Sequence, residues 1–238
     1  MAEARNSSAA ELAHFNRLAS RWWDPNGDFR TLHDLNPVRL AWIENVAGLA
    51  GKRVLDVGCG GGLLSEAMAR RGATVTGLDM SGDSLAIARL HLLESPALSV
   101  EYCETTAEDL ARQSPQVFDV VTCMELLEHV PDPAGLVGAC ARLAKPGGSV
   151  LFSTINRTPE AFATAIVGAE YLTRLVPRGT HRYSQLIRPS ELDAWGRQHG
   201  LQLESLRGGS YNPASRVFTL TSRPVVNYFA HFLANQAT

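Results

Sequence analysis

The sequence lacks a long hydrophobic segment. No stretch of its 238 residues reaches the run of about 18 apolar residues expected of a membrane-spanning helix. Its first residues, MAEARNSS, also lack the apolar core of a secretory signal peptide. We therefore expect a cytoplasmic protein without a transmembrane helix.

Cysteine and excess charge are scarce as well. The four cysteines show no C-x-x-C spacing, so we interpret them as small buried side chains in a reducing compartment; they are Cys59, Cys103, Cys123 and Cys140. The net charge of −2 excludes the global basic field typical of nucleic-acid-binding proteins. With 45% hydrophobic and 19% charged residues, the chain can bury one sizeable core, and we predict a single domain over residues 1–238.

Glycine, by contrast, is concentrated at one point, because residues 54–62 read VLDVGCGGG. The apolar run predicts a buried strand that ends in a tight turn. Gly58, Gly60 and Gly62 allow positive φ angles and a close approach of the backbone to a ligand. The helix that follows would point free N–H groups at the same place, so we predict a nucleotide-like ligand.

Spacing and charge decide which nucleotide this is. A dinucleotide motif, G-x-G-x-x-G, would place its third glycine at Leu63. The observed D-x-G-x-G-x-G is the pattern of S-adenosylmethionine (SAM) methyltransferases. Asp56 would repel a pyrophosphate but attracts the ammonium and sulfonium groups of SAM. A second expected strand ends at Asp79, about where a ribose-binding carboxylate is expected. The alternative is an ordinary strand and turn with no ligand.

Strands and helices alternate through most of the chain, which predicts an α/β fold with a doubly wound, Rossmann-like sheet. We expect seven strands, the last two forming an antiparallel hairpin at one edge, although 225–232 also fits a terminal helix. Such sheets bind ligands at the carboxyl ends of their strands. The expected strands are 53–57, 74–79, 98–103, 117–123, 148–154, 201–206 and 225–232, and the helices between them are 62–71, 82–94, 107–112 and 134–144.

A helical N-terminal region is expected over about residues 9–48. Residues 9–23 carry apolar side chains at helical spacing and end in a tryptophan pair, and they form either a packing helix or a lid over the ligand pocket. Asn36, followed by proline, predicts the start of a second helix. Arg39 would then lie in its first turn, where a cation opposes the helix dipole. We therefore expect a partner carboxylate, which a bound methionine moiety would supply.

Acidic and basic side chains gather after the fourth strand, where residues 124–133 read MELLEHVPDP. If this segment turns helically, Glu125, Glu128 and His129 share one face. Two carboxylates and an imidazole can hold a divalent cation, or His129 alone can act as a general base. Alternatively, the acids cap a helix start and His129 bonds to the backbone.

Residues 157–190 are expected to form a helical insertion after the fifth strand. They hold five arginines against two glutamates, a local charge of +3 in a chain of −2; the arginines are Arg157, Arg174, Arg178, Arg182 and Arg188. Apolar side chains at helical spacing precede most of them. The segment therefore lies peripherally on an anionic membrane, at its inner face, or forms a lid on the substrate pocket, and the two roles are not exclusive.

From about residue 11 to 232, the chain resembles the ubiquinone-biosynthesis O-methyltransferase family. The glycine motif is common to many families, but several other stretches are specific to this one. They are WWD at 22–24, LHDLNPVR at 32–39, MELLEHVPDP at 124–133, STINR at 153–157, GAEY at 168–171, PRGTH at 177–181, YNP at 211–213 and VNY at 226–228.

The resemblance implies methyl transfer from SAM to a ring hydroxyl of a polyprenylated phenol or quinol, demethylubiquinol included. It implies SAM-binding roles for Arg39, Gly58, Asp79 and Met124, beside Asp56 and Gly60 of the glycine motif. It also implies a divalent ion, Mg²⁺, at the positions of Glu125, Glu128 and His129.

Three alternatives belong to other functional classes. A nicotinamide oxidoreductase is disfavoured by Leu63 and Asp56, for the reasons of spacing and charge given above. A non-catalytic SAM-binding protein is disfavoured by the cluster of acids and imidazole at the ligand end of the sheet. A SAM-dependent C-methyltransferase keeps the cofactor and differs only in the atom that receives the methyl group.

Overall fold

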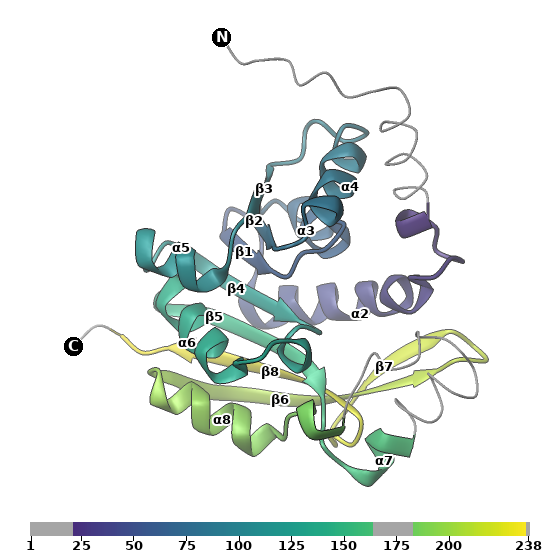
Figure 1. Ribbon diagram of the computed structural model, residues 1–238, viewed down its shortest axis with the longest axis vertical. Helices are drawn as coiled ribbons and strands as arrows, with labels where there is room; N and C mark the ends of the chain where they lie inside the picture. The colour runs from purple at the N-terminus through teal and green to yellow at the C-terminus, as the bar shows by residue number, and fades with distance from the viewer. Residues whose placement is uncertain (1–20, 164–182, 237–238) are drawn as a thin grey trace.

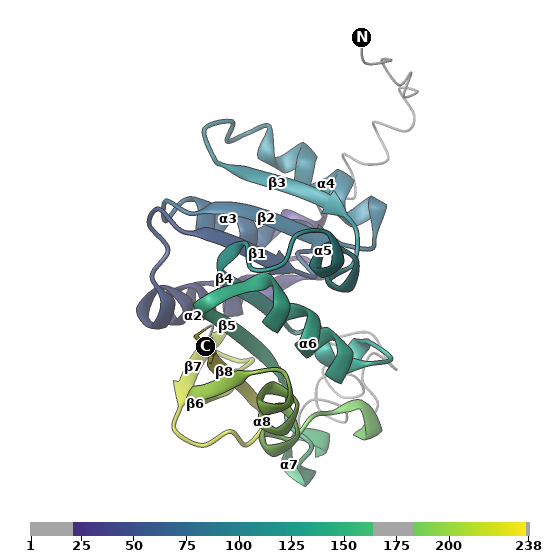
Figure 2. The same cartoon turned by 90° about the vertical axis from the view of Figure 1, so that its left-hand side faces the viewer.

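The computed structural model describes residues 21–163 and 183–236. An eight-stranded sheet runs through it, with helices on both faces (Figures 1 and 2). In spatial order the strands are β3 (Val100–Glu104), β2 (Thr74–Asp79), β1 (Arg53–Val57), β4 (Phe118–Met124), β5 (Ala144–Ile155), β8 (Asn227–Ala234), β6 (Leu201–Asn212) and β7 (Val217–Thr221).

Strand direction divides the sheet into two parts. The strands β3, β2, β1, β4 and β5 are mutually parallel, so their carboxyl ends lie at one edge of the sheet. From β5 onward, each neighbouring pair is antiparallel. The order of the parallel strands reverses between β1 and β4, which is the switch point where ligands bind doubly wound sheets.

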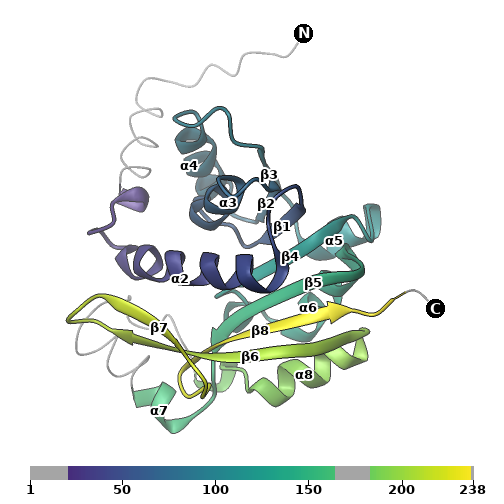
Figure 3. The ribbon, with the colours of Figure 1, turned by 180° about the vertical axis from the view of Figure 1, so that it is seen from behind.

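Helices cover both faces of this sheet. One face carries α2 (Arg30–Ala47), α3 (Leu63–Ala69) and α4 (Gly82–Leu92), and Figure 3 views the molecule from that side. The other carries α5 (Ala107–Gln113), α6 (Pro133–Leu143) and α8 (Pro189–Gln198), which pack against one another in turn. Short helical turns complete the described part of the chain at η1 (Leu127–His129), α7 (Pro159–Ala161) and η3 (Tyr183–Gln185).

The core consists of two apolar layers, one on each side of the sheet. Alternate residues of β4 show how the strand supplies both. Val121 and Cys123 belong to the layer under α6, whereas Val120 and Met124 belong to the layer under α2. All four side chains are at most 6% exposed. Burial on both faces explains why this strand reads as a continuous apolar run.

The doubly wound α/β prediction is confirmed, but the count of seven strands is wrong. The missed strand is β7, which pairs with the second half of β6 as a hairpin. The predicted sixth strand ends at residue 206, whereas β6 continues to Asn212. Its second half contains two glycines and the polar residues Arg207, Ser210 and Asn212, so it lacks an apolar alternation, and pairing with β7 keeps it extended.

The predicted start of the second helix is also wrong. Helix α2 begins at Arg30, so Asn36 and Pro37 lie inside it. Pro37 lies on the exposed side, where the helix loses one backbone hydrogen bond. The buried side chain of Asn36 does not cap the helix. Its Nδ2 makes a tertiary hydrogen bond instead, donating to the carbonyl of Leu63 at 3.3 Å.

Two other predictions fall largely on residues that the structure does not describe. Of the helix expected at 9–23, only residues 21–23 are described, and they are helical. Residues 164–182 of the expected insertion likewise lie outside the described residues. Within the described ranges, no helix is long and apolar enough to cross a membrane.

Candidate active site

The glycine loop connects β1 to α3 at the switch point of the sheet. Gly58 and Gly62 have φ angles of 74° and 88°, which a residue with a side chain rarely adopts. Space is also lacking, since a Cβ on Gly58 would stand 2.8 Å from Cδ2 of Leu126. Glycine is therefore required for two reasons, the backbone angle at both positions and the lack of space at Gly58. This supports the interpretation of the loop as a ligand-binding turn.

Asp56 lies beneath this loop and is only 2% exposed. Its Oδ2 accepts a hydrogen bond from the hydroxyl of Ser65 at 2.6 Å, and its Oδ1 accepts one from Thr122 at 2.9 Å. Burial raises the pKa of this carboxyl, while these two hydrogen bonds and the charge of Arg39 act in the opposite direction. Asp56 thus joins β1 to α3 and β4, and it keeps a carboxylate close to the ligand end.

Arg39 projects from the middle of α2 and is 6% exposed. Its Nε donates to Oδ1 of Asn36 at 2.9 Å. Burial lowers the pKa of the guanidinium, and the negative charges of Asp56 and Glu125 oppose this shift. The argument from the helix dipole is therefore wrong, because Arg39 is not in a first turn. The expected carboxylates exist, however, and they come from the protein itself.

Asp79 is the last residue of β2 and fixes the glycine loop from the side. Its Oδ2 accepts a hydrogen bond from the backbone N–H of Gly60 at 2.9 Å, and its Oδ1 accepts one from Ser81 at 2.8 Å. A carboxylate has about four acceptor positions, so both oxygens retain capacity for a ligand. The structure thus brings Asp79 and the glycine loop together, as the spacing predicted.

The segment after β4 does not turn as an α-helix. Met124 ends the strand and is buried, and Glu125 follows with a φ angle of 54°. The backbone N–H of Glu125 donates to the carbonyl of Ser153 on β5 at 3.0 Å. Only η1, a three-residue 3₁₀ turn, comes next. The premise that residues 125, 128 and 129 share one helical face is therefore wrong.

Glu128 and His129 accordingly lie in different surroundings. Glu128 is 3% exposed, and its Oε2 accepts a hydrogen bond from the hydroxyl of Thr154 at 2.7 Å. Burial, together with the negative charge of Glu125, raises the pKa of Glu128 to about 8. His129, by contrast, is exposed at the end of η1. The imidazole is thus accessible, whereas the carboxyl of Glu128 is held in the interior.

This arrangement does not support the predicted metal site. Among residues 21–163 and 183–236, no three His, Cys, Asp or Glu side chains are grouped so as to hold a metal ion. One oxygen of Glu128 is already engaged with Thr154. The residues present therefore do not fit Mg²⁺ in this conformation.

Several partners of these side chains were not identified from the sequence. Ser65 and Thr122 hold Asp56, Thr154 holds Glu128, and Asn227 of β8 donates to Oε2 of Glu125 at 3.4 Å. Each lies on a different element from the group it supports. Single hydroxyls and amides have no characteristic spacing, so only the tertiary structure reveals them.

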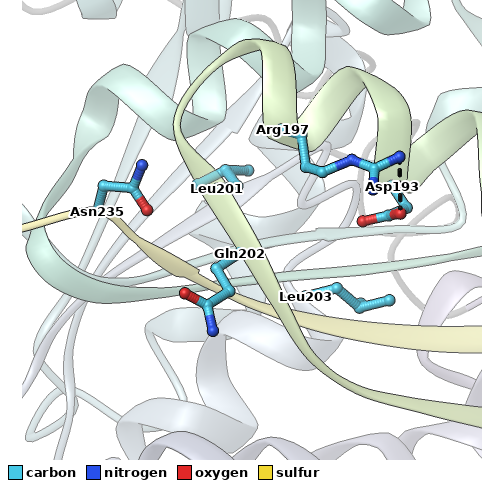
Figure 4. Close-up of a pocket in the computed structure, with 6 residues that line it drawn as sticks. All are labelled: Asp193, Arg197, Leu201, Gln202, Leu203 and Asn235. Carbon is cyan, nitrogen blue, oxygen red and sulfur yellow. Dashed lines mark ion pairs between the residues drawn. The ribbon is translucent and has the colours of Figure 1, made fainter.

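A shallow hollow of about 490 Å³ lies elsewhere, between α8 and the start of β6 (Figure 4). Arg197 and Asp193 form an ion pair of 3.3 Å on its rim. It lies at the amino-terminal side of the parallel strands, because the start of β6 pairs with the end of β8 there. It therefore does not belong to the candidate site; its lining residues are Asp193, Arg197, Leu201, Gln202, Leu203 and Asn235.

Comparison with known proteins agrees with this geometry. A family model described as a methyltransferase domain matches residues 13–206. The ubiquinone biosynthesis O-methyltransferase of Pseudomonas savastanoi pv. phaseolicola is 58% identical over 228 residues, which cover 96% of this chain and 98% of that protein. The enzyme of the same name from Pseudomonas putida GB-1 is 56% identical over 97% of this chain and 99% of its own length.

The chain belongs to the ubiquinone biosynthesis O-methyltransferase family. It is a SAM-dependent O-methyltransferase, as the resemblance implied. Among solved structures, magnesium protoporphyrin IX methyltransferase from Synechocystis with bound S-adenosylhomocysteine superposes with a TM-score of 0.67 at 21% identity, covering 93% of this chain and 94% of that one. That similarity concerns the fold. It confirms the class I methyltransferase architecture and, with the family, excludes a nicotinamide oxidoreductase.

Proposed function

We propose that this O-methyltransferase acts on ring hydroxyls of polyprenylated phenols and quinols in ubiquinone biosynthesis, demethylubiquinol included. The relatives with 58% and 56% identity carry that pathway in their names. The observation that supports the proposal is that the glycine loop, Asp79 and an exposed His129 stand at or after the carboxyl ends of the parallel strands β1, β2 and β4, which lie at one edge of the sheet.

The SAM site in this proposal follows the strand ends. Asp79 would hold the ribose hydroxyls through its remaining acceptor positions, and the backbone of Gly58 and Gly60 would border the methionine portion. Arg39 would supply positive charge toward the carboxylate of that methionine portion, while Asp56 would attract the ammonium and sulfonium groups of SAM. Met124 lines the same side from β4.

The reaction is an in-line displacement. A ring oxygen attacks the methyl carbon of SAM as the carbon–sulfur bond breaks, and S-adenosylhomocysteine leaves as a neutral sulfide. A phenol has a pKa of about 10, so roughly one molecule in a thousand is ionised at pH 7. His129 takes the phenolic proton as general base, and alignment of oxygen, carbon and sulfur supplies much of the remaining acceleration.

Assays of the purified chain with demethylated quinols and polyprenyl catechols test this proposal. We expect O-methylated products, identified by mass spectrometry, and a large loss of turnover in H129Q with SAM affinity retained. Chelation decides the role of a metal ion. Activity that survives EDTA supports His129 as the base, whereas activity abolished by EDTA and restored by Mg²⁺ contradicts the mechanism written here. Methylation at ring carbon would contradict the reaction class.

Access to a lipid-tailed substrate involves the segment 157–190. We propose that it contacts anionic membrane peripherally through its arginines. Two of these lie in the described ranges: Arg157 pairs with Glu191, and Arg188 donates its backbone N–H to the same carboxylate at 2.8 Å. Glu191 in the first turn of α8 therefore binds residues at both ends of the segment, Arg157 and Arg188. Arg174, Arg178 and Arg182, outside the described residues, are the cations proposed to meet the lipid.

A further inference from the structure

The indole of Trp22 lies on the glycine loop. A Cβ on Gly60 would stand 2.9 Å from Cζ2 of Trp22, and one on Gly61 would collide with its Nε1. The indole nitrogen is buried and has no hydrogen-bond partner in the structure. An aromatic N–H donor is therefore held without an acceptor, against the backbone that the proposed function assigns to SAM.

The segment that carries Trp22 is held by aromatic contacts, both within itself and to α4. We call residues 22–29 the strap. The ring of Trp22 contacts Phe29, at 4.0 Å between centroids, within the strap itself. The next residue, Trp23, stacks on His91 of α4 at 3.4 Å and 4°. His91 is in turn held at 2.8 Å by the buried carboxylate of Glu66 on α3.

A single arginine from the far end of the chain fastens the strap. Arg216 lies at the turn between β6 and β7. Its guanidinium donates to Oδ1 of Asn26 at 2.7 Å and to the carbonyl of Pro25 at 2.6 Å. It also donates to both oxygens of Asp34 on α2, at 2.8 and 3.1 Å, where the hydroxyl of Tyr211 donates as well. The hairpin thus holds the strap against α2.

We propose that Trp22 is a SAM-binding residue whose indole N–H donates to an acceptor oxygen of the bound cofactor, and that Arg216 is the positioning residue that keeps it there. This inference rests on the proposed placement of SAM at the glycine loop. A buried N–H without an acceptor costs free energy, and an oxygen of the bound cofactor would remove this cost at Trp22. It also gives the β6–β7 hairpin a role in cofactor binding.

Calorimetric titration with SAM tests the proposal. W22F keeps an aromatic ring but removes the donor, and we expect its dissociation constant to rise roughly tenfold or more, as for a lost hydrogen bond to a charged group. R216A should also bind SAM more weakly while its thermal unfolding stays cooperative. R207A, which removes an exposed arginine from β6 in the same hairpin, is the matched control and should bind as the wild type does.

A double-mutant cycle separates positioning from general stability. If Arg216 acts through Trp22, W22A/R216A binds SAM no more weakly than W22A alone, whereas independent losses that add would overturn the positioning role. Should R216A fail to fold, R216K serves instead, because lysine keeps the charge but loses the planar, five-donor guanidinium. Wild-type affinity in W22F would overturn the role of Trp22. If D79A also binds as the wild type, the SAM site itself is misplaced; if D79A alone is weakened, only this inference fails.

Discussion

At the scale of single residues, Asp79 connects the geometry of the glycine loop with the proposed cofactor site. Its two oxygens accept hydrogen bonds from Gly60 and Ser81 at 2.9 and 2.8 Å, and the proposed ribose contacts use the same carboxylate. D79A should weaken SAM binding by about 1–3 kcal/mol, because the ribose hydroxyls of the proposed site lose their charged acceptor. Calorimetry measures this, with D83A in the exposed first turn of α4 as control. An unchanged dissociation constant would contradict the assignment.

The second prediction at this scale concerns Asp56. Ser65 is fully buried and donates to Oδ2 of Asp56 at 2.6 Å. S65A removes a hydrogen bond to a buried carboxyl, so we expect the free energy of unfolding to fall by about 1.5–3 kcal/mol. Urea denaturation measures the loss, and S222A, at an exposed position, should change little. Equal stability of S65A and the wild type would refute the structural role of Asp56.

At the scale of elements, β8 carries a histidine in the interior of the sheet. His231 is 7% exposed and shares a hydrogen bond of 3.0 Å with the hydroxyl of Ser149 on β5. Burial lowers the pKa of its imidazole, while the charge of Glu204 opposes the shift. The unfolded chain therefore binds this proton more readily than the folded one. Stability should fall as the pH drops below the ordinary histidine value of about 6.5.

The slope of stability against pH in this window should be smaller in H231Q. H199Q, which removes an exposed imidazole instead, is the matched control. Urea midpoints measured from pH 7.5 to 5 would decide. An H231Q curve parallel to that of the wild type would mean that this imidazole does not titrate differently in the folded state.

Elements were predictable from the sequence where one local signal sufficed. Strand β1 and the glycine turn were predictable because an apolar run is followed directly by the spaced glycines. Strand β2 was predictable because its apolar run ends in Asp79. The start of α2 was missed because Asn36 and Pro37 form a good local helix start. In the structure, the buried Asn36 side chain donates a hydrogen bond to the carbonyl of Leu63 instead. β7 was missed because its pairing with β6, and not its own pattern, makes it a strand.

The candidate site was predictable to a similar degree. Asp79 and the glycine loop meet as the spacing indicated, because parallel strands bring their carboxyl ends together. The environments of Glu128 and His129 were not predictable, since a positive φ at Glu125 and the hydroxyl of Thr154 decide them. Trp22 lies on Gly60 and Gly61, which are distant from it in the sequence, and no local pattern encodes such a contact.

At the scale of the whole molecule, the segment 157–190 is expected to meet a membrane surface. Each arginine near anionic lipid contributes about 1 kcal/mol, and salt weakens the attraction. Liposome sedimentation should show stronger binding to anionic than to neutral vesicles, and a loss when Arg174, Arg178 and Arg182 are changed to Gln. Binding that ignores lipid charge, or that survives these changes, would mean that the segment serves only as a lid.

In the proposed function, the whole molecule serves one transfer, from SAM at the carboxyl ends of β1 and β2 to a substrate oxygen next to His129 after β4. The most direct test is a single-turnover reaction with SAM labelled in its methyl carbon and a polyprenyl catechol, followed by NMR of the product. The account predicts label on a ring oxygen for the wild type, and a much slower transfer in H129Q at saturating SAM. Label on ring carbon, or equal rates in the two proteins, would contradict it.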